Sequence, residues 1–182
     1  MCKGSFGLYV VAKEPNRAKS RLAAQLHERI GHQHPQLART IATAFADAAL
    51  ADVLVNLKQG TSNARRVLLY APPEDDTRQA FVSILRRLSL SDHWELEPVA
   101  SATDSSASSS DLTHVLSGAV NHCRIVLRCK ALVLAGMDWP EISAELVERL
   151  ANAAIGGRAR ISAAADGGYV ALAIPASERT EA

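Results

Sequence analysis

Short apolar runs alternate with longer stretches of helical periodicity along the chain, and no other feature of the sequence restricts the fold as strongly. The run at residues 131–135 is apolar at every position, as a strand covered on both faces of a sheet requires. Further strand-like runs occupy residues 8–12, 67–71, 94–99, 159–163 and 169–174. Strands that alternate with helices predict an α/β fold with a mostly parallel sheet. Because 182 residues contain neither a repeat nor an interdomain linker, we expect a single domain over residues 1–182.

The stretches between the strand-like runs carry apolar residues at helical spacing. We expect helices over residues 36–55, 77–88, 111–123 and 143–155. In the first of them, Leu37, Ile41 and Phe45 form the apolar face that an amphipathic helix turns toward the core. Ser143 stands at the N-cap position of the last helix, and Gly156 ends it.

Charge and cysteine content narrow the functional classes. The chain has 20 basic and 19 acidic residues, so its net charge of +1 gives no reason to expect a nucleic-acid or anionic membrane partner. Three cysteines without a CxxC pair argue against structural zinc and a disulfide framework. The early apolar run at residues 8–12 is too short for a signal peptide or a membrane span. We therefore expect a cytoplasmic protein.

A basic loop follows the first strand-like run. Lys13, Arg17, Lys19 and Arg21 place four cations within nine residues, and the last two lie near the expected start of a helix. The amides and dipole of a helix N-terminus favour an anion. Since neither GxGxxG nor GxxxxGK[ST] occurs, a phosphate would need these side chains as its counter-charge. A solvated basic turn is the alternative interpretation for each of the four.

Two acidic residues also lie at the ends of strand-like runs. Asp138 precedes Trp139 and Pro140, and a carboxylate held there suits Mg²⁺ or Mn²⁺, with an Asx turn or N-cap as the alternative. Asp166 precedes Gly167 and Gly168, which allow a sharp turn and a close approach to a ligand, although Asp-Gly is also a common hairpin signal. Ligands of parallel α/β sheets gather outside the carboxyl ends of the strands. These positions predict a site for a metal and a phosphorylated ligand.

Three segments, taken in order, resemble one family. Residues 11–22 (VAKEPNRAKSRL) resemble its opening AKxPxxGxxKTRL loop. Residues 133–143 (VLAGMDWPEIS) resemble its GSDxPxLT segment, and residues 164–169 (AADGGY) resemble its PAxDGGYxL segment. The family is the DUF2064, or arsenosugar-biosynthesis-type, glycosyltransferase group. Its fold is the GT-A nucleotide-diphospho-sugar transferase fold, a Rossmann-like three-layer α/β/α arrangement.

This resemblance implies a transferase that takes a nucleotide-activated sugar donor. The side chains that would face the donor phosphates are Lys13, Lys19 and Arg21. Asp138 would hold the Mg²⁺ or Mn²⁺ that bridges the diphosphate and stabilises the leaving group. Asp166 would lie near the ion or the acceptor, with Gly167 and Gly168 allowing close approach of the backbone.

The sequence departs from the family pattern at three places. The opening loop is about two residues shorter and lacks its glycine, and Met137 stands where the family has serine. Only thirteen residues follow Tyr169, whereas the family continues with an acceptor-side segment. The acceptor pocket is then expected to be incomplete, or to be completed by another subunit of a homo-oligomer.

Two alternatives stay open at this point. The first is a nucleotidyltransferase that releases pyrophosphate from a nucleoside triphosphate. The second is a degenerate, non-catalytic domain that serves as a nucleotide-binding or assembly module.

Overall fold

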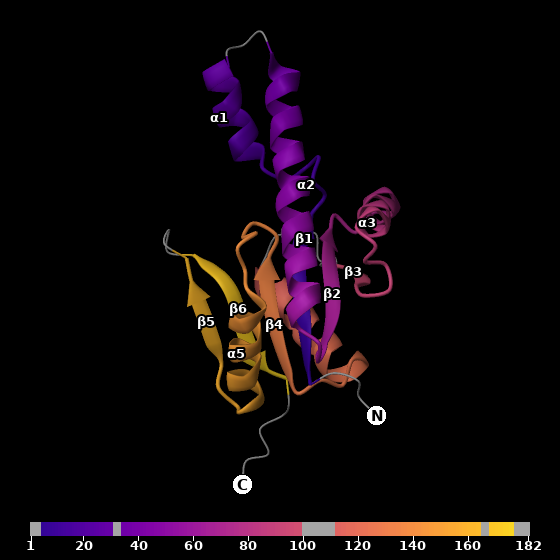
Figure 1. Ribbon diagram of the computed structural model, residues 1–182, viewed down its shortest axis with the longest axis vertical. Helices are drawn as coiled ribbons and strands as arrows, with labels where there is room; N and C mark the ends of the chain where they lie inside the picture. Colours follow the sequence, from indigo (N-terminus) through magenta and orange to yellow (C-terminus); the bar gives the residue numbers. More distant parts are fainter. Residues whose placement is uncertain (1–4, 31–33, 100–111, 165–167, 177–182) are drawn as a thin grey trace.

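The computed structural model describes residues 5–30, 34–99, 112–164 and 168–176, and its centre is a six-stranded sheet in the order β3-β2-β1-β4-β6-β5 (Figure 1). The strands are β1 (Phe6–Lys13), β2 (Ala64–Ala71), β3 (Glu95–Pro98), β4 (Ala131–Gly136), β5 (Arg160–Ala163) and β6 (Tyr169–Pro175). The first four are parallel to one another, whereas β6 pairs antiparallel with both β4 and β5. The predicted α/β fold with a mostly parallel sheet is confirmed.

The expected helices are present and lie close to their predicted positions. They are α1 (Ser20–Ile30), α2 (Pro35–Gly60), α3 (Asp75–Arg87), α4 (Leu112–Asn121) and α5 (Ala144–Ile155), and a short π-helical turn (His122–Val126) continues α4. Ser143 caps α5 as predicted, since its hydroxyl oxygen accepts a hydrogen bond from the Leu146 amide at 3.2 Å. Helix α1 begins at Ser20, within the last residues of the basic loop, close to the helix start that Lys19 and Arg21 were expected to flank.

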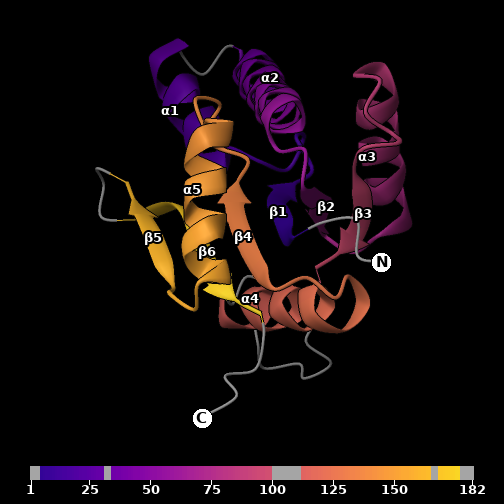
Figure 2. The same cartoon turned by 60° about the horizontal axis from the view of Figure 1, so that its bottom comes forward.

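The sheet separates two hydrophobic clusters. Leu8 and Val10 of β1 point into the larger cluster, which they share with residues of α2, α3 and α5. Tyr9, between them, points to the other face, where α4 packs. This alternation follows the two-residue period of a strand and gives the three-layer arrangement visible in Figure 2.

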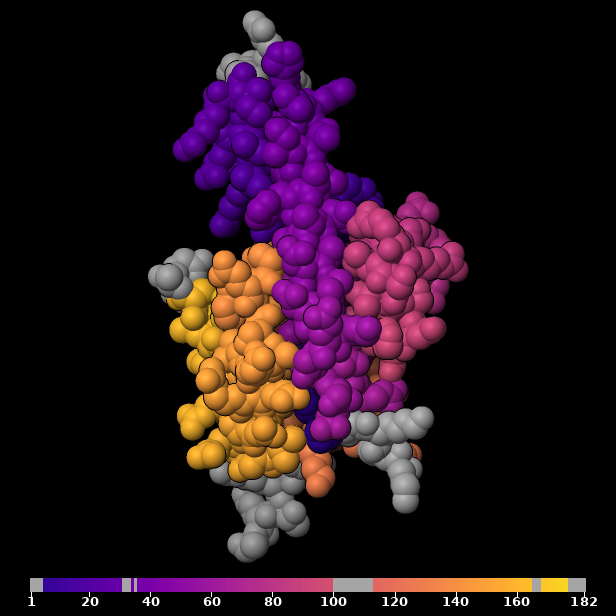
Figure 3. Space-filling view, in the orientation of Figure 1, coloured from indigo at the N-terminus to yellow at the C-terminus, as the bar shows by residue number. Residues whose placement is uncertain are grey.

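The buried face of helix α2 differs from the one predicted from the sequence. Leu37, Ile41 and Phe45 are 48%, 40% and 50% exposed, so they do not form the buried face. The buried residues of that half are the small Ala38, Ala42 and Ala46. The reason is length, because a helix of 26 residues extends about 39 Å whereas a strand of 8 residues extends about 26 Å. The first half of α2 therefore projects beyond the sheet together with α1 (Figure 1), and these two helices form the protruding end of the molecule in Figure 3.

Helix α2 is also, within the described part of the chain, the one helix long and apolar enough to cross a membrane by length and composition. Its second half packs against the sheet through Leu50, Val53, Leu54 and Leu57, all fully buried. The expectation that the chain has no membrane span stays a prediction.

The end of α2 fixes the segment that follows β4. Gly60 lies so close to the first residue of α5 that a Cβ atom built on it would come within 2.0 Å of the Ala144 Cβ. One turn earlier, the Asn56 side-chain amide donates a hydrogen bond to the Pro140 carbonyl at 3.0 Å. These contacts position the residues between β4 and α5, which include Asp138.

Candidate functional site

The basic loop and the turn after β4 meet at the carboxyl ends of β1 and β4. The Met137 amide donates to the Val11 carbonyl at 3.2 Å, and the Lys13 amide donates to the Met137 sulfur at 3.3 Å. Met137 itself is buried. The backbone and the side chain of Met137 thus join the two strand ends, and the residue that departs from the family's serine packs and forms hydrogen bonds between them.

A cleft of about 730 Å³ lies between the two segments, and we call it the basic cleft. Its lining residues are Val11, Lys13, Ala18, Lys19, Ser20, Arg21, Leu22, Gly136, Met137 and Asp138. The structure therefore brings together four of the predicted site residues: Lys13, Lys19, Arg21 and Asp138. The first turn of α1, whose Ser20, Arg21 and Leu22 line the cleft, contains no acidic residue of its own, which suits an anion near this helix N-terminus.

Lys19 and Asp138 form the closest charged contact of the basic cleft. The Lys19 ammonium lies 2.7 Å from Asp138 Oδ1 and 5.4 Å from the centre of the Phe45 ring. The Lys19 side chain is 19% exposed and that of Asp138 is 67% exposed. The backbone of Lys19 adopts φ +56°, a left-handed conformation that non-glycine residues rarely take. Lys19 is therefore held in place, whereas the Asp138 carboxylate faces solvent.

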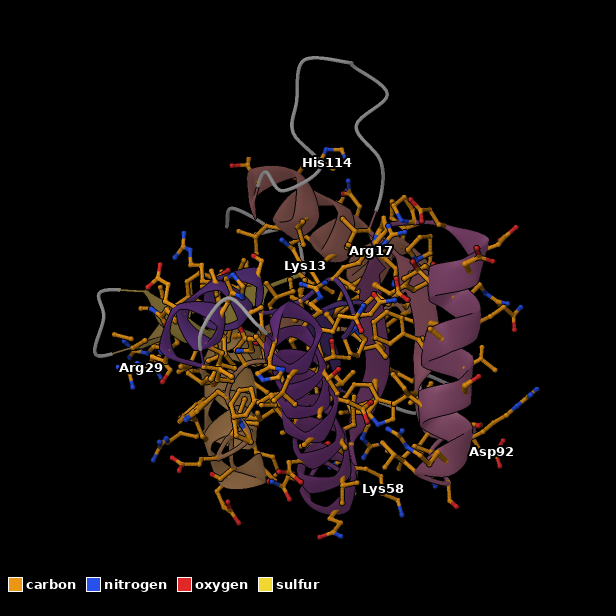
Figure 4. The ribbon with its side chains drawn as sticks, turned by 90° about the horizontal axis from the view of Figure 1, so that it is seen from above. Lys13, Arg17, Arg29, Lys58, Asp92 and His114 are labelled. Carbon is orange, nitrogen blue, oxygen red and sulfur yellow. The ribbon has the colours of Figure 1, made fainter. Side chains whose placement is uncertain are left out.

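Arg17 does not lie in the basic cleft, although the sequence grouped it with the other cations. Its guanidinium pairs with Glu14 at 3.4 Å and with Glu74, just before α3, at 3.1 Å. Figure 4, a view onto the carboxyl ends of the strands, shows Arg17 on the α3 side of Lys13. Arg17 therefore lies outside the residues that line the basic cleft, with its charge paired to two carboxylates, and its role at the phosphate site stays a prediction.

The Asp-Gly-Gly element can be located only in part. Asp166 and Gly167 lie outside the described residues. Gly168 is exposed just before β6, and its carbonyl accepts a hydrogen bond from the Ala164 amide at 2.9 Å. The roles expected for Asp166, Gly167 and Gly168 stay predictions.

A second pocket, of about 290 Å³, lies between α4 and the ends of β2 and β3, and we call it the histidine pocket. His122 lines it and joins two groups: its Nδ1 lies 2.9 Å from the Tyr9 hydroxyl and its Nε2 lies 3.8 Å from a Glu97 carboxylate oxygen. His114 also lines the pocket, and its buried Nε2 has no hydrogen-bond partner in the part of the chain that the structure describes. Burial is the main cause that raises the pKa of Tyr9.

Sequence reasoning did not find the histidine pocket. His114 and His122 are two turns apart on one helix, which is a spacing that a core face also shows. Nothing in the sequence pairs them with Glu97, since β3 and α4 are separated in the chain by a serine-rich stretch. Only the sheet register brings Glu97 to the same side as α4.

The basic cleft and the histidine pocket are neighbours along one row of the sheet. Glu97 of β3 is aligned with Leu69 of β2, Leu69 with Val11 of β1, and Val11 with Gly136 of β4. Residues aligned in this way point to the same face. Glu97 and Leu69 line the histidine pocket, whereas Val11 and Gly136 line the basic cleft. The row extends over about 14 Å, because three strand spacings of about 4.8 Å separate β3 from β4.

A further cleft, of about 500 Å³, lies between α2 and α3 but is less suited to an anion. Its charged lining residues are Glu14, Arg39, Asp47 and Arg87, whose formal charges cancel. Arg87 there is held by both carboxylate oxygens of Asp47 at 2.7 and 2.8 Å. The basic cleft, by contrast, has three cations and one carboxylate, and its formal charge is +2.

The donor set of the basic cleft decides how a divalent metal could bind there. Across the described residues there is no group of three or more His, Cys, Asp or Glu side chains that could hold a metal ion. Asp138 is the one acidic side chain among the residues that line the basic cleft. Mg²⁺ commonly uses one or two carboxylates together with phosphate oxygens and water. The cleft therefore fits a metal that is shared with a bound phosphate, and does not fit an all-protein metal site.

The fold is that of nucleotide-diphospho-sugar transferases. A crystal structure from Desulfovibrio desulfuricans G20, of a protein assigned as a nucleotide-diphospho-sugar transferase, matches with a TM-score of 0.71 and 18% identity over 95% of this chain. A cytidylyltransferase from Leptospira borgpetersenii serovar Hardjo-bovis matches with a TM-score of 0.52 and 14% identity over 95% of this chain. The chain spans 64% and 61% of the lengths of these two proteins.

The sequence itself defines the family. The chain belongs to DUF2064, described as "Uncharacterized protein conserved in bacteria", whose model matches residues 53–181. The match begins within α2, so the basic loop and α1 lie before it. No curated protein matches the sequence.

Proposed function

We propose that the basic cleft binds the diphosphate of a nucleotide-diphospho-sugar and that the protein transfers the sugar to an acceptor. The observation that carries this proposal is the convergence of Lys13, Lys19 and Arg21 on one cleft, with Asp138, at the carboxyl ends of two parallel strands. The diphosphate of such a donor carries about two negative charges, which the +2 formal charge of the lining side chains would balance.

The histidine pocket supports a ligand longer than a phosphate. It shares a row of the sheet with the basic cleft, and its lining is apolar apart from Glu97, His114 and His122. A nucleoside attached to the diphosphate could extend from one to the other along this row. The buried Nε2 atom of His114 would then find a polar group of the nucleoside as its partner.

The roles of the side chains follow from their positions. Lys13 and Arg21 are exposed at the rim of the basic cleft and would hold the phosphate oxygens. Asp138 would hold Mg²⁺ or Mn²⁺ together with the diphosphate, and such an ion supplies charge neutralisation of the leaving nucleoside diphosphate. Asp166 is proposed to act near the acceptor, and Gly167 and Gly168 to allow the backbone to approach the ligand.

A thermal-shift screen tests the proposal. Nucleoside mono-, di- and triphosphates and UDP-, GDP- and dTDP-sugars would be compared, each with and without Mn²⁺. A ligand at 100 times its dissociation constant stabilises the native state by about 2.7 kcal/mol, which raises the Tm of a chain of this size by roughly 5–11 °C. A shift with one diphosphate-sugar supports the donor site, and the absence of any shift favours the non-catalytic module.

Two substitutions make this screen specific to the basic cleft. Arg21→Gln removes a cleft cation, whereas Arg17→Gln removes a cation of the same type four residues away that is paired with Glu14 and Glu74. We expect the ligand-induced shift to fall clearly in the first variant and little in the second. Equal losses in both would contradict the assignment of the cleft.

The nucleotidyltransferase alternative is favoured by the similarity to a cytidylyltransferase, which concerns the fold alone. The two activities differ in their products. Pyrophosphate release from a nucleoside triphosphate supports the alternative, and release of a nucleoside diphosphate from a diphosphate-sugar supports the glycosyltransferase. The cytoplasmic location and the homo-oligomer remain predictions.

A further inference from the structure

The Lys19 ammonium occupies part of the space that a divalent ion bound to Oδ1 of Asp138 would need. Its nitrogen lies 2.7 Å from Asp138 Oδ1, whereas Mg²⁺ binds carboxylate oxygens at about 2.0–2.1 Å. A cation at either distance uses the same oxygen, and two cations side by side there would repel each other. Metal and ammonium therefore compete for Oδ1 of Asp138.

Lys19 is also prevented from moving freely away from this position. Its backbone has φ +56°, which persists in a non-glycine residue only where the surroundings impose it. Its ammonium lies over the Phe45 ring, and its side chain is about four-fifths buried. The contact with Asp138 is therefore a fixed feature of the ligand-free protein, unlike an ion pair between two flexible surface side chains.

The other two cations of the basic cleft, Lys13 and Arg21, differ from Lys19 in their charged partners. Within the described ranges, neither Lys13 nor Arg21 forms an ion pair. They can attract a diphosphate without giving up a partner. Lys19 can join them only by exchanging the Asp138 carboxylate for phosphate oxygens, and this exchange uncovers Asp138.

We propose that Lys19 is an internal counter-cation that keeps divalent metal off Asp138 until a diphosphate enters the basic cleft. The diphosphate takes over the Lys19 ammonium, and Asp138 then binds the metal together with the phosphate oxygens. Metal and diphosphate consequently bind as a pair, and free metal binds weakly. Because coupling between two ligands is reciprocal, each raises the affinity of the other. This inference rests on the proposed function of the cleft.

Mn²⁺ alone is the first probe, measured by the electron paramagnetic resonance signal of free Mn²⁺ and by calorimetry. Lys19→Met removes the ammonium and keeps the length of the side chain, and we expect it to bind Mn²⁺ about tenfold more tightly than the wild type, a typical coupling. Lys19→Gly is the second variant, because glycine adopts φ +56° without strain and keeps the backbone of the loop. Asp138→Asn should abolish the gain in either background.

Lys13→Met is the matched control, since it removes the same charge from the same cleft without touching Asp138. Its Mn²⁺ affinity should rise much less than that of the Lys19 variants. The proposal is overturned if the Lys19 variants bind Mn²⁺ no more tightly than the wild type. It is also overturned if Lys13→Met gains as much, because the effect would then come from the general charge of the cleft.

Inorganic pyrophosphate without metal is the second probe. Lys19→Met should bind pyrophosphate several-fold more weakly than the wild type. The affinity of this variant for Mn²⁺ should therefore rise while its affinity for the diphosphate falls. A purely structural role of Lys19 would weaken both, and unchanged pyrophosphate binding would refute the exchange step. If the wild type itself bound neither pyrophosphate nor any nucleotide, the proposed function would fail, while the Mn²⁺ measurement would still decide whether Lys19 blocks Asp138.

Discussion

Replacing Gly60 by alanine should weaken the junction between α2 and α5. The new methyl group would lie 2.0 Å from the Ala144 Cβ, whereas carbon atoms in contact are about 3.5–4.0 Å apart. The two helices must therefore separate by nearly 2 Å, or their ends must rearrange. Since Ala144 is the first residue of α5, this movement would also displace the turn that carries Asp138.

The size of the effect follows from two opposing contributions. Overpacking of this kind costs about 1–3 kcal/mol. Alanine favours a helix over glycine by up to about 1 kcal/mol, which offsets part of that cost. A net loss of roughly 1–2 kcal/mol corresponds to a fall in Tm of about 2–8 °C for a chain of this length. Urea unfolding followed by circular dichroism measures the same loss as a lower midpoint.

Two controls separate the steric contact from the substitution itself. Gly118→Ala places a methyl group where no atom lies within 4 Å, so this variant should gain about 0.5–1 kcal/mol from helix propensity. Ala144→Gly, combined with Gly60→Ala, removes the opposing methyl group and should restore most of the lost stability. The reasoning is refuted if Gly60→Ala is as stable as the wild type, or if Ala144→Gly gives no recovery.

Three further predictions concern the core, the cap of α5 and alkaline pH. Phe81→Ala should lose about 3–5 kcal/mol because its ring is fully buried, whereas Phe45→Ala, half exposed on α2, should lose about 1 kcal/mol. Equal losses in urea unfolding would contradict the corrected face of α2. Ser143→Ala should cost about 1 kcal/mol and speed hydrogen exchange in the first turn of α5, and unaltered exchange there would exclude the cap. Burial raises the pKa of Tyr9, so the folded state keeps its proton at pH values where the unfolded chain, with a pKa of about 10, has released it. Stability should therefore fall as the pH rises above about 10, and urea midpoints measured across this range should show a shallower fall for Tyr9→Phe than for the wild type.

Much of the fold could be predicted because it depends on local patterns. The continuous apolar run of β4 indicated a strand covered on both faces, and five of its six residues are buried. The Ser143 cap and the helical spacing of the buried residues of α3 both depend on residues within a few positions of one another. Asp138 and Lys13 could be placed at strand ends for the same reason, since the end of an apolar run is visible in the chain.

The faces and partners of these elements could not be predicted in the same way. Helical periodicity identified a stripe through Leu37, Ile41 and Phe45, but it carries no information about what lies opposite. In the tertiary structure α2 is longer than the sheet it covers, and this stripe lies on the projecting half. His122 likewise meets Tyr9 and Glu97 only because these side chains of β1 and β3 point to the face of the sheet on which the π-helical turn after α4 packs.

The sequence by itself determined the order of strands and helices and the positions of the charged residues at their ends, because both follow from periodicity and turn chemistry within short windows. Only the tertiary structure decided which cations share the basic cleft. Arg17 and Lys19 are two residues apart, yet one pairs with Glu74 before α3 and the other with Asp138 after β4. A charge acts over a few ångströms whatever the chain separation, so the fold determines which partner it meets.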